Sequence, residues 1–164
     1  MKFVVDTNVI AVANHMADQA SPSCRSICVR ELREIERSHT VVLDDQWRIL
    51  QEYKSYWRRI GQPQVGDRFV LWALRNVNNR ARCELIAITP VLHSEDGNDF
   101  VEFPQDPDLA NFDRSDRKFV AVTLAHPERP PILNAVDTDW WRHRSAFERC
   151  GVIIHFLCPD AIGE

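Results

Sequence analysis

The chain contains 164 residues, of which 45% are hydrophobic and 27% are charged, and its formal net charge at pH 7 is −4. These values are typical of one soluble globular domain; they exclude a wholly disordered chain and argue against a basic surface that coats nucleic acid. No apolar run reaches the roughly 18 residues of a membrane span. Because Asp6 also interrupts the first apolar run too early for a signal peptide, we expect a cytoplasmic protein with no membrane contact.

Strands and helices alternate along the predicted chain. The predicted strands are short apolar runs at residues 2–5, 40–43, 83–88, 131–136 and 152–157. The predicted helices cover residues 9–16, 21 to at least 35, 44 or 45 to 60, 67–76, 113–125 and 139–150, with Asp44 or Asp45 capping the third of them. This alternation predicts a single α/β domain over residues 1–164, with a mostly parallel sheet covered by helices on both faces.

A long connection at residues 89–111 interrupts this pattern. Seven acids lie from His93 through Asp113, with Asp113 included, and no lysine or arginine accompanies them. Because loops beyond about 15 residues are uncommon in compact domains, we interpret the segment as a lid or insertion near the functional edge. A short edge strand at residues 100–103 is expected inside it.

The five cysteines do not follow a common metal-binding spacing. They are Cys24, Cys28, Cys83, Cys150 and Cys158. Because free cysteines usually pack as small hydrophobic residues, we expect all five to be free thiols in a reducing cytosol.

Acids follow three of the predicted strands. They are Asp6 after the first strand, Asp113 and Asp116 after the third strand and the long loop, and Asp137 and Asp139 after the fourth. Ligands of open parallel sheets bind beyond the carboxyl ends of the strands, so these acids are expected at one edge. Each of them could instead cap a helix, which is the structural alternative.

Glu52 is a further candidate in the middle of the third helix. At about 100° per residue it falls on the border of the buried face. That face carries Ile49, Tyr53, Tyr56 and Ile60. Glu52 therefore either has a specific role or is a surface glutamate paired with Arg48 or Arg59.

Acids gathered at one edge require a compensating charge or a proton. Two carboxylates about 4 Å apart repel by about 4 kcal/mol at an effective dielectric constant near 20. Mg²⁺ and Mn²⁺ prefer carboxylate and water ligands, whereas zinc is disfavoured because no histidine or cysteine accompanies the acids. A site of this kind suits metal-assisted attack of water on a phosphodiester.

Four segments in order resemble the PIN-domain family of metal-dependent ribonucleases, which includes many toxins of bacterial toxin–antitoxin pairs. The segments are Val4–Ile10, Leu50–Tyr53, Asp113–Val122 and Ala135–Trp140. The resemblance implies a three-layer α/β/α domain that cleaves RNA with one or two Mg²⁺ or Mn²⁺ ions. It implies catalytic roles for Asp6, Glu52, Asp116 and Asp137, with Asp6, Asp116, Asp137 and Asp139 as metal ligands. Thr7 and Asn8 would orient Asp6, and Asp113 would flank the site.

The leading hypothesis is thus a metal-dependent endoribonuclease, in which Arg114, Arg117 or Arg142 grips substrate phosphates. RNA is the expected substrate. Whether the chain also binds an antitoxin, another protein partner or a second copy of itself stays open. The alternative is a catalytically silent PIN-like module that binds RNA or a protein. A phosphoacceptor receiver domain is disfavoured, because that fold needs a lysine at the same edge and Lys118 is predicted inside a helix.

Overall fold

The computed structural model describes residues 1–57 and 61–162. Its centre is a five-stranded sheet in which every strand pairing is parallel, with the order β3-β2-β1-β4-β5. The strands are β1 (Lys2–Val5), β2 (Thr40–Asp44), β3 (Cys83–Ile86), β4 (Ile132–Asn134) and β5 (Ile154–Phe156). All five predicted strands are therefore present, although three of them are shorter than predicted.

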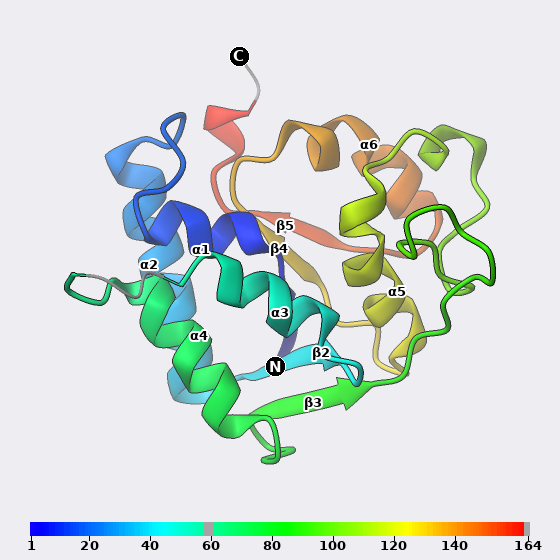
Figure 1. The fold of residues 1–164 in the computed structure, drawn as a ribbon. Coiled ribbons are helices and arrows are strands. Elements are labelled where there is room, and N and C mark those ends of the chain that lie inside the picture. The colour runs from blue at the N-terminus through cyan, green and yellow to red at the C-terminus, as the bar shows by residue number, and fades with distance from the viewer. Residues whose placement is uncertain (58–60, 163–164) are drawn as a thin grey trace.

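Helices cover both faces of this sheet. They are α1 (Thr7–Ala13), α2 (Pro22–Ser38), α3 (Arg48–Ser55), α4 (Val65–Asn76), α5 (Arg117–Ala125) and α6 (Thr138–Arg149). Helices α1–α4 gather on one side of the sheet, and α5 and α6 lie on the other (Figure 1). The expected three-layer α/β/α arrangement is confirmed.

The central strand β1 has a neighbour on each side, which explains its composition. Val4 and Val5 are completely buried, as expected for a parallel strand covered on both faces. The chain winds outward from β1 to β2 and β3 on one side, and then returns to β4 and β5 on the other. The carboxyl ends of β1 and β4 thus form the point where the winding direction reverses, which is where open α/β sheets bind ligands.

Several predicted helix boundaries differ from the structure. Helix α5 begins at Arg117 rather than at residue 113, because Arg114–Asp116 form a separate 3₁₀ turn, α1 ends at Ala13 rather than at residue 16, and α4 begins at Val65 rather than at residue 67. The starts of α1 and α3 differ for local reasons. Helix α1 begins at Thr7, directly after Asp6, and is therefore two residues earlier than predicted. Helix α3 begins only at Arg48, because β2 continues to Asp44, whose carboxylate accepts the backbone N–H groups of Arg48 (2.9 Å) and Ile49 (2.8 Å). Asp44 thus satisfies the first donors of α3, as predicted. The helix ends at Ser55, and the predicted end at residue 60 lies outside the described residues.

The connection at residues 89–111 contains no named strand. The edge strand predicted at residues 100–103 is wrong, since only one isolated bridge forms there, between Pro90 and Phe100. The connection instead buries Phe100, Phe103 and Leu109. It is a packed segment with its own apolar contacts.

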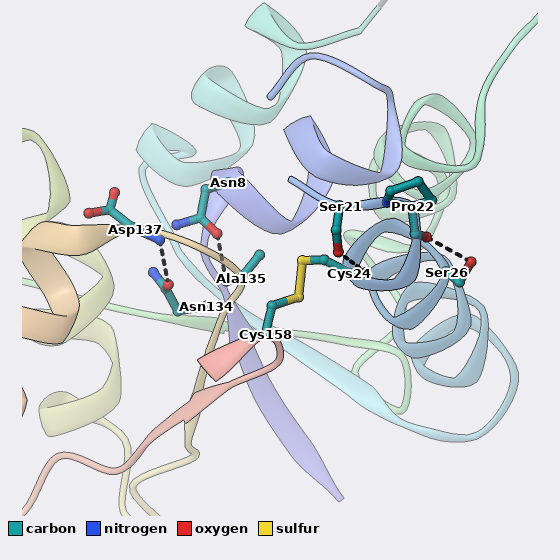
Figure 2. The surroundings of a disulfide bond; sticks show 9 residues. All are labelled: Asn8, Ser21, Pro22, Cys24, Ser26, Asn134, Ala135, Asp137 and Cys158. Atoms are coloured by element: carbon teal, nitrogen blue, oxygen red, sulfur yellow. Dashed lines mark hydrogen bonds between the residues drawn. A yellow bond between two sulfur atoms is a disulfide. The ribbon is translucent and has the colours of Figure 1, made fainter. Parts of the chain in front are cut away.

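Two of the five cysteines form a disulfide, which corrects the expectation that all are free. Cys24, in the first turn of α2, is bonded to Cys158, which follows β5 (Figure 2). The two residues are 134 apart in sequence, so local spacing could not reveal that the fold brings their Cα atoms within 5.5 Å. Cys28, Cys83 and Cys150 are free.

In the described part of the chain, no helix is both long and apolar enough to cross a membrane.

Candidate functional site

Asp6 lies at the end of β1 and is held by three neighbouring side chains. It is only 2% exposed. Its Oδ2 accepts hydrogen bonds from the amide nitrogens of Asn8 (2.8 Å) and Asn134 (2.7 Å), and its Oδ1 lies 3.3 Å from the Thr7 hydroxyl. The contacts of Thr7 and Asn8 with Asp6 are as the sequence predicted, whereas sequence reasoning missed Asn134.

The two asparagines also connect the ends of β1 and β4. The Asn8 Oδ1 accepts the backbone N–H of Ala135 (2.7 Å), and the Asn134 Oδ1 accepts that of Asp137 (3.2 Å), as Figure 2 shows. Each amide therefore donates to Asp6 with its nitrogen and accepts from the segment after β4 with its oxygen. This arrangement fixes Asp6 relative to the backbone of Asp137.

Helix α3 brings Glu52 to the same edge. The hydroxyl of the fully buried Tyr53 donates to the carbonyl oxygen of Val5 (2.5 Å), which pins α3 against the end of β1. The neighbouring Glu52 accepts a hydrogen bond from Thr7 and forms an ion pair with Lys118 of α5. Of the two surface partners considered for Glu52, Arg48 lies 3.6 Å from Asp44 instead, and Arg59 is outside the described residues.

The acids before α5 have different local roles. The Asp113 carboxylate accepts the backbone N–H of Ser115 (2.9 Å) and its hydroxyl (2.8 Å), so Asp113 caps the short 3₁₀ turn at Arg114–Asp116. The Asp116 carboxylate caps nothing, and no described residue donates a hydrogen bond to it. Asp116 is therefore free to bind something else.

Asp137 and Asp139 begin α6, and both make structural contacts. The Asp137 Oδ1 accepts the backbone N–H of Asp139 (2.8 Å), while its carboxylate points away from the disulfide in Figure 2. The Asp139 Oδ2 accepts the backbone N–H of Asp113 (3.0 Å), and its Oδ1 lies 3.3 Å from Nδ1 of His143. Asp139 therefore joins the start of α6 to the segment before α5.

The four central acids lie within electrostatic reach of one another. Burial raises the pKa of Asp6 well above its usual value, and Asp116, Asp137 and Glu52 raise it further. Burial also raises the pKa of Asp116 to about 7; Asp137 and Glu52 add to this shift, and Lys118 opposes it. The sequence prediction that these acids share one edge thus agrees with their interactions.

The acids are nevertheless not packed tightly enough to form a closed cage. In the described ranges, the only group of three or more possible ligand atoms within 4.8 Å of one another is Cys24, Cys28 and Cys158, all buried. A Mg²⁺ ion usually keeps several waters and binds one or two carboxylates directly, so no more than two of these acids would be direct ligands of one ion and water would complete its coordination. The free oxygens are those of Asp116 and Oδ2 of Asp137, whereas Oδ1 of Asp6 has only the 3.3 Å contact with the Thr7 hydroxyl.

Two of the three arginines predicted to grip phosphates face the acidic connection. Arg114 pairs with Asp99 (2.7 Å), and Arg117, which is only 9% exposed, pairs with the same carboxylate (2.5 Å). Arg117 also donates to the carbonyl oxygen of Ala110 (3.0 Å). These two residues therefore anchor residues 89–111, whereas Arg142 is exposed and lies 3.8 Å from Asp139.

Comparisons of the chain with protein-family models, with curated proteins and with solved structures find no match. The fold and the contacts described above are therefore the observations from which a function is inferred.

Proposed function

We propose that this chain is a Mg²⁺- or Mn²⁺-dependent endoribonuclease with Asp6, Glu52, Asp116 and Asp137 in its active site. One observation carries the proposal. Hydrogen bonds join three acids from separate segments at the edge where parallel sheets bind ligands: Thr7, next to Asp6, donates to Glu52, and Asn134 joins the Asp6 carboxylate to the backbone N–H of Asp137. The three acids Asp116, Asp137 and Glu52 also raise the pKa of Asp6, beyond the larger effect of burial. The resemblance of the same four segments to PIN-domain ribonucleases supports this assignment.

The donor set suits a hard divalent cation, because the free ligand atoms are carboxylate oxygens. A Mg²⁺ or Mn²⁺ ion bound there would supply an activated water and would stabilise the leaving oxygen of the phosphodiester. Asn8 and Asn134 hold Asp6 in one orientation. Arg142 is the arginine that we assign to substrate phosphates, because it is exposed beside the site.

The proposal makes RNA the substrate and the cytoplasm the compartment, with a cognate antitoxin as the partner if the chain is a toxin. The Cys24–Cys158 disulfide bears on the compartment, because disulfides are rare in the reducing cytosol. The thiol state of the protein in cells therefore tests the compartment separately from the activity.

The test is cleavage of pooled cellular RNA with Mg²⁺, with Mn²⁺ and with chelator. We expect cleavage only with metal, and Asp116→Asn is expected to reduce the rate at least about 100-fold, because ligand residues matter more than the residues that orient them. Asp18→Asn is the matched control, since Asp18 is an exposed aspartate away from the site. Cleavage that is the same in Asp116→Asn and in the wild type would contradict the proposal.

The same assay decides the silent alternative. Intact RNA that still binds the protein would favour a binding module. Lys118 lies in α5, as predicted, but its ammonium group reaches the acidic edge. The position of Lys118 in a helix therefore does not argue against a receiver domain. The strand order separates the two folds instead, since doubly wound sheets of the receiver type have the order 2-1-3-4-5.

A further inference from the structure

Lys118 places a positive charge among the acids of the candidate site. Its side chain is only 7% exposed, and its ammonium group pairs with Oε2 of Glu52. The same group donates to the carbonyl oxygen of Ser115 and lies 4.8 Å from the centre of the Phe119 ring. Lysines are almost never this buried unless they are paired, so the pairing with Glu52 is a specific feature of the fold.

The pairing leaves Glu52 poorly suited to bind a metal ion. Its Oε1 accepts the hydrogen bond from Thr7, and its Oε2 faces the ammonium group. A divalent ion on either oxygen would lie close to a lysine charge in a half-buried setting, where like charges repel more strongly than in water. Glu52 is therefore engaged by protein donors on both oxygens.

The three aspartates have free oxygens that Glu52 lacks. No described residue donates to the Asp116 carboxylate, and one oxygen of Asp137 is likewise free. The Asp6 Oδ1 has only the 3.3 Å contact with Thr7. The hydroxyl of Thr7 has a single proton, and Glu52 is its closer acceptor, so Oδ1 of Asp6 is left open.

We propose that Lys118 is a positioning residue that holds Glu52 in place of a second cation, so that the site binds one divalent ion, with no more than two of Asp6, Asp116 and Asp137 as direct ligands. This inference rests on the proposed function, because it assumes the same metal site. In a site with two metal ions, the second ion supplies a positive charge beside the acids. Here the ammonium group of Lys118 supplies that charge. Glu52 then orients Thr7 and the start of α1 beside Asp6.

The test counts bound Mn²⁺ ions per chain by electron paramagnetic resonance and by titration calorimetry. Only ions that are lost in Asp116→Asn are counted, which removes weak binding to the acidic segment at residues 89–111. We expect one ion in the wild type and one in Lys118→Arg, which keeps the charge. We expect two in Lys118→Met, because its neutral side chain of similar length releases Glu52.

Two variants control this result. The double variant Lys118→Met/Glu52→Gln removes both charges of the pair and should return the number of bound ions to one. It also serves as the second variant if Lys118→Met alone fails to fold. Lys2→Met removes a lysine that pairs with Glu84 (2.9 Å) and Glu128 (2.6 Å), away from the site, and should keep the count at one.

The outcomes separate this inference from the proposed function. A wild type that cleaves RNA and binds two ions overturns the inference alone, as does a Lys118→Met variant that still binds one. A wild type that binds one ion, a Lys118→Met variant that binds two and an absence of RNA cleavage support the inference and overturn the ribonuclease. A chain that binds no Mn²⁺ overturns both.

Discussion

Asp116 is the residue whose ionisation should be easiest to observe in solution. Its pKa is raised by burial to about 7 in the folded chain, from an ordinary value of 3.8. Between these two pH values the folded state keeps a proton that the unfolded chain has released. Without metal, the free energy of unfolding should therefore fall as the pH rises from about 4 to about 7.

This pH dependence is measured by urea unfolding in chelator, with the wild type and Asp116→Asn compared at each pH. The variant should show a shallower decline, because Asp6 is shifted in the same direction and still contributes. Adding Mg²⁺ at neutral pH should stabilise the wild type and not the variant. Equal slopes in the two proteins would mean that Asp116 ionises as an ordinary surface acid.

The site residues that the sequence predicted differ from those that it missed in one physical respect. Asp6 and Asp137 were found because each follows a strand, and this position is visible in the local pattern. Asn134 and Lys118 were missed because their contacts depend on β4 lying beside β1 and on α5 facing α3. A polar residue at the end of a buried strand was the available signal for Asn134, but strand order was needed to interpret it.

At the scale of elements, Gly66 controls how closely α4 approaches α1. A Cβ atom at this position would lie 2.8 Å from the carbonyl oxygen of Ile10 and 2.5 Å from Oδ1 of Asn14. Asn14 cannot easily move away, because its amide donates to Oδ1 of Asp67 (3.0 Å) and accepts the Asp67 backbone N–H (3.2 Å). Glycine is therefore required by the packing of the two helices.

The variant Gly66→Ala tests this requirement through the sign of its effect. In an unobstructed helix, alanine is more favourable than glycine by about 1 kcal/mol. Here we expect Gly66→Ala to lower the free energy of unfolding by about 1–3 kcal/mol, the usual range for overpacking. Urea denaturation measures the change, and a variant as stable as the wild type would show that α1 and α4 can separate at little cost.

The wrong prediction of an edge strand also has an explanation at this scale. A strand would bury alternate residues, but the buried aromatic residues are Phe100 and Phe103, and Val101 is 64% exposed. Both oxygens of the Glu102 carboxylate accept the backbone N–H of Thr89, at 3.0 Å each. Residues 89–111 thus follow contacts to the rest of the fold rather than a strand pattern.

At the scale of the whole molecule, the order of elements was predictable and the order of strands was not. Alternation of short apolar runs with helical patterns predicts a parallel sheet with helices on both faces. The pattern does not state which strands are neighbours, and the reversal of winding between β1 and β4 is what joins Asp6 to Asn134. The candidate site is therefore a consequence of topology as much as of the residues themselves.

The Cys24–Cys158 disulfide is the longest-range covalent constraint in the described chain, since it joins residues 134 apart. Closing so long a loop restricts the unfolded chain strongly, so Cys158→Ala should lower the free energy of unfolding by roughly 2–5 kcal/mol. Cys150→Ala is the matched control, because Cys150 is a free, partly exposed thiol. The control should leave the stability much closer to that of the wild type.

Thiol titration in denaturant provides an independent measurement of the same bond. The unreduced protein should show three reactive thiols, from Cys28, Cys83 and Cys150, and reduction should add the two from Cys24 and Cys158. Reduction should also lower the stability of the wild type toward that of Cys158→Ala, because both lose the same constraint on the unfolded chain. Five reactive thiols before reduction, with no effect of reductant on unfolding, would mean that the two cysteines pack together without a bond.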